Sequence, residues 1–192
     1  MPRLILLNGP PASGKSTLAR RYGVDHPLAL ALDIDVVRSL LGGWLDDPEA
    51  AGVAARAMAL AMAREHLRAG RDVVVPQFLA RPQLPEQLEL LARDVDAEFA
   101  EVVVDLDPDQ MLTRFVRRTA EAGRGEHRDA AELLGRGGGT PQLLTMRAQM
   151  LSMVAQRPRA RFLASRDGDL EGTYRSLLDI VGAASARPRS MD

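Results

Sequence analysis

The chain of 192 residues contains no cysteine. Disulfide bonds, thiol catalysis and cysteine-ligated metals are therefore excluded. Neither sign of charge dominates, because 25 Lys and Arg residues stand against 26 Asp and Glu residues. A net charge of −1 gives no general electrostatic reason to bind nucleic acid or an anionic membrane. We expect neither as a partner.

The sequence also lacks a hydrophobic stretch long enough to span a membrane. Its first residues, Met1 to Arg3, lead directly into an apolar run and leave no room for a signal peptide. These features predict a cytoplasmic protein. A hydrophobic content of 46% is typical of one globular domain with a full core. We expect this domain at residues 1–183 and a disordered tail at 184–192, in a monomer or homodimer.

Short apolar runs alternate along the chain with longer amphipathic segments. The pattern predicts strands near residues 3–8, 28–33, 72–75, 99–105 and 160–164. It predicts helices near residues 15–23, 35–41, 48–69, 84–95, 108–122, 141–156 and 170–182. Strands that alternate with helices favour an α/β fold, with a five-stranded parallel sheet covered on both faces. Ligands of such sheets bind at the carboxyl ends of the strands.

Residues 123–139 interrupt this alternation with a segment rich in glycine and charge. The helices on either side have clear boundaries, because Asp107-Pro108 and Thr140-Pro141 each place a capping residue before a proline. A segment of this kind between two helices is typical of a mobile lid over an active site.

The strongest motif lies in LNGPPASGKSTLA, residues 7–19. It has the spacing G-x-x-x-x-G-K-S/T between a buried strand and a helix, which is the context of a phosphate-binding P-loop. Glycines let backbone N–H groups turn toward an anion, and the helix N-terminus adds partial positive charge. The motif predicts that ATP is bound by Gly9, Pro11, Ala12, Ser13, Gly14, Lys15, Ser16 and Thr17.

Two side chains of this motif have specific roles. Lys15 would reach the β- and γ-phosphates, and the Ser16 hydroxyl would ligate Mg²⁺. Lys15 is also the only lysine in a chain whose other basic residues are all arginine. A lone lysine at the position that needs a compact ammonium group supports this role.

The second predicted strand runs into LALDIDVVR, which places two carboxylates at the strand end. Asp35 could accept a proton from a substrate hydroxyl, and Asp33 could support Mg²⁺ through a water molecule. Arg38, three residues past Asp35 in a helix, would lie on the same face and could clamp an anionic part of the acceptor. Asp35 could also be the N-cap of a helix from Val36, and the two roles can coexist.

Together these motifs resemble the small P-loop kinases of the chloramphenicol phosphotransferase, zeta-toxin and adenylylsulfate kinase group. LALDID is similar to the segment of the phosphotransferase that ends in its catalytic aspartate, and DIDVVR resembles the DGDNVR of adenylylsulfate kinases. The resemblance covers most of the chain and implies a three-layer P-loop NTPase fold. On either comparison the catalytic base would be Asp35.

The third predicted strand ends in Pro76-Gln77, where many of these relatives have an aspartate that helps to hold the metal. Adenylylsulfate kinases also lack this acid in their similar stretch, so its absence is compatible with a kinase. Gln77 and Phe78 become candidates for substrate contact, with plain loop packing as the alternative.

Arginines near the predicted lid are candidates for nucleotide contacts. RFVRR resembles the adenylate kinase segment whose first arginine stacks on adenine and whose last reaches phosphate, here Arg114 and Arg118. Arginines that arrive on lid closure would stabilise the charge of the transition state. The alternative is a solvated basic face, since Arg114 and Arg117 project from the side opposite apolar residues such as Val116.

Arg147 lies at the centre of an apolar stripe on the predicted helix 141–156. The stripe consists of Leu143, Leu144, Met150, Leu151 and Val154. A charge in this position must pair, snorkel or point into a cleft. Arg147 is therefore a catalytic candidate that would bind phosphate or substrate, with snorkelling as the alternative.

These features favour an ATP- and Mg²⁺-dependent kinase that phosphorylates a hydroxyl of a small metabolite, such as an antibiotic, sugar, nucleoside or nucleotide-sugar. The acceptor would contact Asp33, Asp35, Arg38, Gln77 and Phe78. Two other classes stay open. A P-loop ATPase or nucleotide-dependent switch would hydrolyse ATP without an acceptor, and an RNA-end kinase would bind RNA in a salt-sensitive way.

Overall fold

The computed structural model describes residues 1–120 and 140–185, so the predicted lid and residues 186–192 lie outside the described residues. The strands are β1 (Arg3–Asn8), β2 (Leu30–Ala31), β3 (Val73–Gln77), β4 (Glu98–Asp105) and β5 (Arg161–Ala164). The helices are α1 (Lys15–Asp25), α2 (Ile34–Ser39), α3 (Pro48–Arg68), α4 (Gln83–Asp94), α5 (Pro108–Ala120), α7 (Thr140–Val154) and α8 (Leu170–Ser185). None of these helices combines the length and the apolar character needed to cross a membrane.

The strands form one parallel sheet in the order β2-β3-β1-β4-β5, which confirms the predicted α/β fold. β2 is much shorter than the predicted strand 28–33, because it pairs with β3 only at Leu30 and Ala31. Leu28 has a left-handed backbone with φ of 68°, which excludes it from a strand. On the other side, Asp33 already begins the turn into α2.

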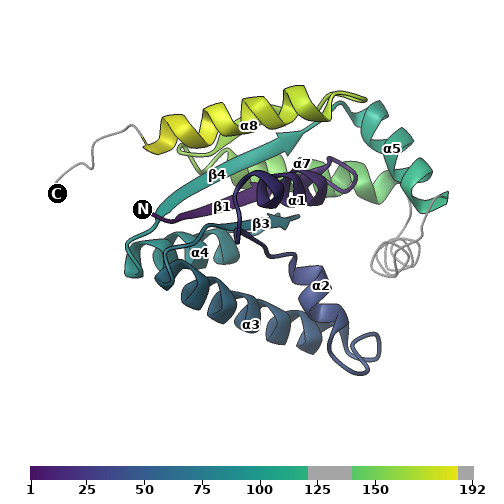
Figure 1. Cartoon of the computed structure of the whole chain (residues 1–192). Coiled ribbons are helices and arrows are strands. Elements are labelled where there is room, and N and C mark those ends of the chain that lie inside the picture. Colours follow the sequence, from purple (N-terminus) through teal and green to yellow (C-terminus); the bar gives the residue numbers. More distant parts are fainter. Residues whose placement is uncertain (121–139, 186–192) are drawn as a thin grey trace.

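Helices cover both faces of the sheet, as Figure 1 shows. Leu4 and Leu6 of β1 pack in the cluster that contains α3 and α4, whereas Ile5 and Leu7 pack in the cluster that contains α1 and α8. The continuous apolar run of β1 is therefore buried on both faces, as expected for a central parallel strand. The result is the predicted three-layer arrangement.

Two arginine–carboxylate pairs join β4 to α7 and the segment after it. Arg147 contacts Asp105 with both ends of its guanidinium, at 3.0 Å from Nε to Oδ1 and 2.7 Å from Nη2 to Oδ2. Arg157 contacts the buried Glu101, and its Nη2 lies 3.0 Å from Oε2 of Glu89 on α4. These pairs fix the middle of α7 and the segment just after it against the sheet.

Some expected faces and boundaries differ from the structure. α8 continues to Ser185, so residues 184 and 185 belong to a helix and not to the predicted tail. Val116 is 63% exposed and Leu144 is 43% exposed, so these two members of the predicted apolar face and stripe are not buried. The reason is that the buried stripes are narrower than the apolar ones: α5 buries Met111, and α7 buries Leu143, Met150, Met153 and Val154.

Candidate active site

Asn8, the last residue of β1, ties the start of the predicted phosphate loop to the segment after β3. Its Oδ1 accepts hydrogen bonds from the N–H groups of Gly9 at 2.8 Å and Leu79 at 2.9 Å. Its Nδ2 donates to the carbonyl oxygen of Leu79 at 3.1 Å. This role was not predicted, although a fully buried polar residue at the end of an apolar run indicates it.

The backbone of the loop requires small residues at specific positions. A Cβ atom on Gly9 would lie 2.3 Å from the carbonyl oxygen of Val104 in β4, so no larger residue fits without displacing that strand. Gly14 has φ of 92°, and Ala12 has φ of 64° despite its side chain. A left-handed alanine costs about 1–3 kcal/mol, and such strain is concentrated at ligand-binding sites. The loop therefore has the tightly curved form that the P-loop motif predicts.

Lys15 is the first residue of α1, and its side chain folds back into the loop. Its Nζ donates hydrogen bonds to the carbonyl oxygen of Pro10 at 2.7 Å and to Oγ of Ser13 at 3.2 Å. Lys15 is only 9% exposed. The ammonium group and the helix N-terminus together favour an anion at this position, in agreement with the predicted phosphate contact.

The loop lines a cavity of about 440 Å³, a volume suited to a small ligand. The lining residues from the loop and α1 are Ala12, Ser13, Gly14, Lys15, Ser16, Thr17, Leu18 and Arg20. The other lining residues come from α5, the turn after β5 and the start of α8: Arg114, Arg117, Ser165, Arg166, Asp167, Gly168, Leu170 and Thr173. Gly9 and Pro11 shape the loop without lining the cavity. Arg20 was not predicted, although it follows Ser16 by one helical turn and so shares its face.

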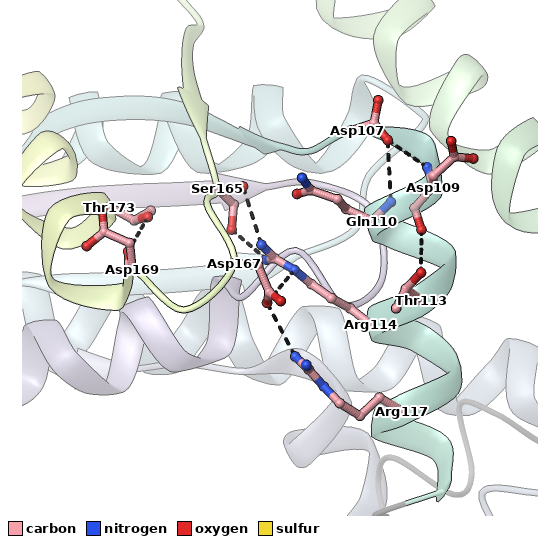
Figure 2. Close-up of polar contacts among 10 residues, drawn as sticks. All are labelled: Asp107, Asp109, Gln110, Thr113, Arg114, Arg117, Ser165, Asp167, Asp169 and Thr173. Atoms are coloured by element: carbon pink, nitrogen blue, oxygen red, sulfur yellow. Dashed lines mark hydrogen bonds and ion pairs between the residues drawn. The ribbon is translucent and has the colours of Figure 1, made fainter.

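Arg114 and Arg117 converge from α5 on the turn after β5, as Figure 2 shows. Arg114 donates to Oγ of Ser165 at 2.9 Å, and its Nε lies 3.2 Å from Oδ1 of Asp167. Nη2 of Arg117 lies 3.3 Å from the same carboxylate oxygen. With its side chain only 10% exposed, Arg114 is held firmly at the cavity. Arg117 was not predicted as a nucleotide ligand, and the side chain of Arg118 lies outside the described part of α5.

Helix caps fix the starts of α5 and α8, and Figure 2 shows the Asp107 cap and the contact of Thr173 with Asp169. At the start of α5, Oδ1 of Asp107 accepts a hydrogen bond from the N–H of Asp109 at 2.9 Å, as the Asp-Pro sequence predicts. At the start of α8, Oδ1 of Asp169 accepts from the N–H of Gly172 at 2.8 Å, and Thr173 donates to the Asp169 carbonyl oxygen at 2.7 Å.

Ser16 and Asp33 connect the loop to the segment after β2. Oγ of Ser16 donates to Oδ2 of Asp33 at 3.0 Å, and Oδ1 of Asp33 accepts from the N–H of Asp35 at 3.1 Å. Asp33 is therefore the N-cap of α2. The alternative that Asp35 caps a helix from Val36 is wrong, because the helix begins earlier, at Ile34.

Asp35 lies in the first turn of α2, with its side chain 44% exposed and Oδ1 3.1 Å from Nη2 of Arg38. The surrounding protein desolvates the carboxylate and thereby raises its pKa above that of an ordinary aspartate. Arg38 lowers the pKa, Asp33 raises it further, and Lys15 and a hydrogen bond from Gln77 lower it again. The structure thus brings these predicted residues together. A raised pKa makes Asp35 a stronger base near neutral pH.

Two other predicted site residues have structural contacts. Phe78 packs with Val103 and Met150, so the loop-packing alternative describes its environment. Arg147 pairs with Asp105, as described above, and this pair satisfies its charge. Its predicted role in catalysis stays a prediction.

The groups beside the loop suit Mg²⁺. Ser16 and Asp33 offer a hydroxyl and a carboxylate, the hard oxygen donors that this ion prefers. Among residues 1–120 and 140–185, no group of three or more His, Cys, Asp and Glu side chains could hold a metal. Mg²⁺ is usually bound by one or two protein ligands together with substrate phosphates, so these two residues fit it.

A family described as an AAA domain matches residues 4–135, more than half of the chain. The chain belongs to this AAA domain family. The match includes the phosphate loop, the Asp33–Arg38 segment and all of α5. The resemblance to the small P-loop kinases is thereby confirmed. A search of curated proteins found no significant match.

Solved structures share the fold at low sequence identity. A candidate kinase from Chloroflexus aurantiacus is 17% identical with a TM-score of 0.70, over 95% of this chain and 98% of that chain. A gluconokinase from Sinorhizobium meliloti is 16% identical with a TM-score of 0.60, over 96% of this chain and 94% of that chain. Kti12 from Chaetomium thermophilum, solved in complex with ADP-AlF3, is 18% identical with a TM-score of 0.62, over 96% of this chain and 100% of that chain. These likenesses confirm the α/β P-loop fold.

Proposed function

We propose that the protein is an ATP- and Mg²⁺-dependent kinase that phosphorylates a hydroxyl group of a small molecule. The observation that carries the proposal is the place of the half-buried Asp35: its N–H donates to Asp33, and Asp33 accepts a hydrogen bond from Ser16 of the phosphate loop. A P-loop alone supports only nucleotide binding. A carboxylate with a raised pKa beside that loop adds the base that an alcohol acceptor needs.

The nucleotide would occupy the cavity between the loop and α5. Lys15 and the N-terminus of α1 would neutralise the phosphates, and Arg114 and Arg117 would contact the opposite end of the ligand. Ser16 and Asp33 would hold Mg²⁺, which supplies positive charge next to the phosphate oxygens. Asp35 would accept the hydroxyl proton while the acceptor oxygen bonds to the γ-phosphorus and ADP leaves.

An acceptor screen tests this activity. Purified protein is incubated with Mg²⁺, ATP and sugars, nucleosides, nucleotide-sugars, hydroxylated antibiotics or an RNA oligonucleotide with a 5′-hydroxyl, and ADP release and label transfer are measured. Transfer to a small hydroxyl compound supports the proposal. ADP release without any acceptor would indicate an ATPase, and selective labelling of the oligonucleotide would indicate an RNA-end kinase.

Asp35→Asn tests the proposed base. We expect turnover to fall by about 10²-fold or more while ATP affinity changes little, because the substitution removes the proton acceptor and keeps the side-chain shape. Asp94→Asn is the matched control, since Asp94 forms a surface ion pair with Arg64 on α3. Near-normal turnover in Asp35→Asn would exclude Asp35 as the base.

A further inference from the structure

Trp44 is the only tryptophan of the chain and lies in the connection between α2 and α3. A tight turn surrounds it, because Gly43 has φ of 66° and the N–H of Asp46 donates to the Gly43 carbonyl oxygen at 2.9 Å. Asp47 then caps α3 by accepting from the N–H of Ala50 at 3.0 Å. Trp44 is therefore held between a defined turn and a helix start.

The Trp44 ring lies against the guanidinium of Arg38, with Cζ 4.7 Å from the ring centroid. The same guanidinium places Nη2 at 3.1 Å from Oδ1 of Asp35. The Arg38 side chain is 20% exposed, whereas that of Asp35 is 44% exposed and open to an acceptor. Arg38 thus bridges a fixed aromatic face and the proposed catalytic carboxylate.

The contact between Arg38 and Asp35 depends on the Trp44 ring that holds the guanidinium in place. Arginine has a long side chain with many rotamers, and a cation–π contact restricts it to few of them. α2 has only six residues, and Arg38 lies in its last turn. Without the indole ring, the guanidinium can rotate into solvent and leave the Asp35 carboxylate without its partner.

We propose that Trp44 is a positioning residue that holds Arg38 against Asp35, so that the Asp35 carboxylate is oriented toward the acceptor hydroxyl. Trp44 acts through Arg38 and does not itself contact the reacting atoms. The inference rests on the proposed role of Asp35 in phosphoryl transfer.

A double-mutant cycle on turnover tests this relationship. Trp44→Ala should lower kcat by about tenfold with little change in the KM for acceptor or ATP, and Trp44→Phe should recover part of the loss because phenylalanine keeps a weaker cation–π face. In an Arg38→Met background, Trp44→Ala should cause no further loss. Leu45→Ala is the control, since Leu45 is a 42% exposed neighbour in the same connection, and it should retain wild-type kcat.

Three results would overturn the proposal. An equal loss from Trp44→Ala with and without Arg38 would show that Trp44 acts independently of it. A rise in acceptor KM without a fall in kcat would place Trp44 in direct contact with the acceptor. An equal loss in Leu45→Ala would assign the effect to the folding of the whole connection, which the melting temperatures of the variants would also reveal.

Fluorescence of the lone tryptophan tests the arrangement without turnover. Arg38→Met should change the Trp44 emission of the free protein, because it removes the cation from the ring. Asp35→Asn should change it in the same direction by releasing Arg38, whereas Asp94→Asn should leave it unchanged. Wild-type emission in Arg38→Met or in Asp35→Asn would overturn the proposal. If the emission changes are present but no acceptor is phosphorylated, the proposed kinase function fails and the coupling between Trp44 and Asp35 stands.

Discussion

The hydroxyl of Ser16 donates a hydrogen bond to the carboxylate of Asp33, 17 residues away in the sequence, at 3.0 Å. The two residues follow β1 and β2, which are not neighbours in the sheet because β3 lies between them. The contact therefore reaches across the end of β3, which carries Gln77 instead of an acid. Asp33 therefore places a carboxylate next to Ser16, whereas the end of β3 carries none.

If the proposed function holds, Asp33→Asn should weaken Mg²⁺ binding without removing the helix cap, because asparagine caps helices as well as aspartate does. We expect the Mg²⁺ concentration for half-maximal activity to rise by about 10–100-fold, the usual effect of losing a partner of a metal ligand. The measurement is a Mg²⁺ titration at saturating ATP. An unchanged Mg²⁺ requirement would exclude Asp33 from the metal site.

Gly9→Ala should abolish most nucleotide binding, since its Cβ would lie 2.3 Å from the Val104 carbonyl oxygen. The strand or the loop must move, at a cost of about 1–3 kcal/mol in the free energy of unfolding. Gly182→Ala in α8 is the matched control, because a Cβ there meets no atom within 4 Å. We expect it to bind ATP normally and to be slightly more stable. Chemical denaturation and calorimetric titration with ATP separate the two effects.

Asp167→Asn should loosen Arg114 and Arg117 in the part of the cavity that α5 and the turn after β5 form. We expect weaker binding of ATP, by about tenfold, because two charge-assisted contacts lose their shared acceptor. Tripolyphosphate has no base or ribose, so its affinity should stay near the wild-type value. Equal weakening for both ligands would contradict a role of these arginines in binding the base or ribose. Asp169→Asn is the control, because Asp169 caps α8 in the same turn and forms no ion pair with either of these two described arginines.

The phosphate loop could be predicted from sequence because its geometry is local. The spacing from Gly9 to Ser16 fixes a strand, a turn and a helix start within a few residues, and the structure contains all three. Asp35 and its neighbours could be predicted for a related reason. The carboxyl ends of parallel strands meet at one edge, so residues that follow β2 and β3 come close to the loop.

The residues that were not predicted depend on contacts between distant segments. The sequence does not indicate that Trp44 lies on Arg38, or that Asp167 is shared by two arginines, because these pairings are set by how helices and loops dock. Helical periodicity has a similar limit at Leu144. It gives the direction of an apolar face, but the width of the buried stripe depends on the neighbouring helix.

Arg157→Met tests the charge network that holds α7 on the sheet. Glu101 has a side chain only 2% exposed, and burial raises its pKa while Arg157 lowers it. Removal of Arg157 leaves a buried carboxylate without its cation, which should reduce the free energy of unfolding at neutral pH by about 3–5 kcal/mol. Arg159→Met is the control, since Arg159 is 84% exposed and lies 3.8 Å from Glu89.

The pH dependence of this deficit follows from the direction of the pKa shift. Because its pKa is raised in the folded state, the Glu101 carboxyl binds a proton more readily in the folded protein than in the unfolded chain. The free-energy cost of keeping it charged and buried therefore grows as pH rises through the folded pKa. Arg157→Met raises that pKa further. The difference in stability between the variant and wild type should therefore be largest at neutral pH and shrink as the pH is lowered, when Glu101 becomes protonated in the fold. Urea unfolding of both proteins across this range measures the difference, and a deficit that is independent of pH would assign the effect to lost packing of the arginine side chain.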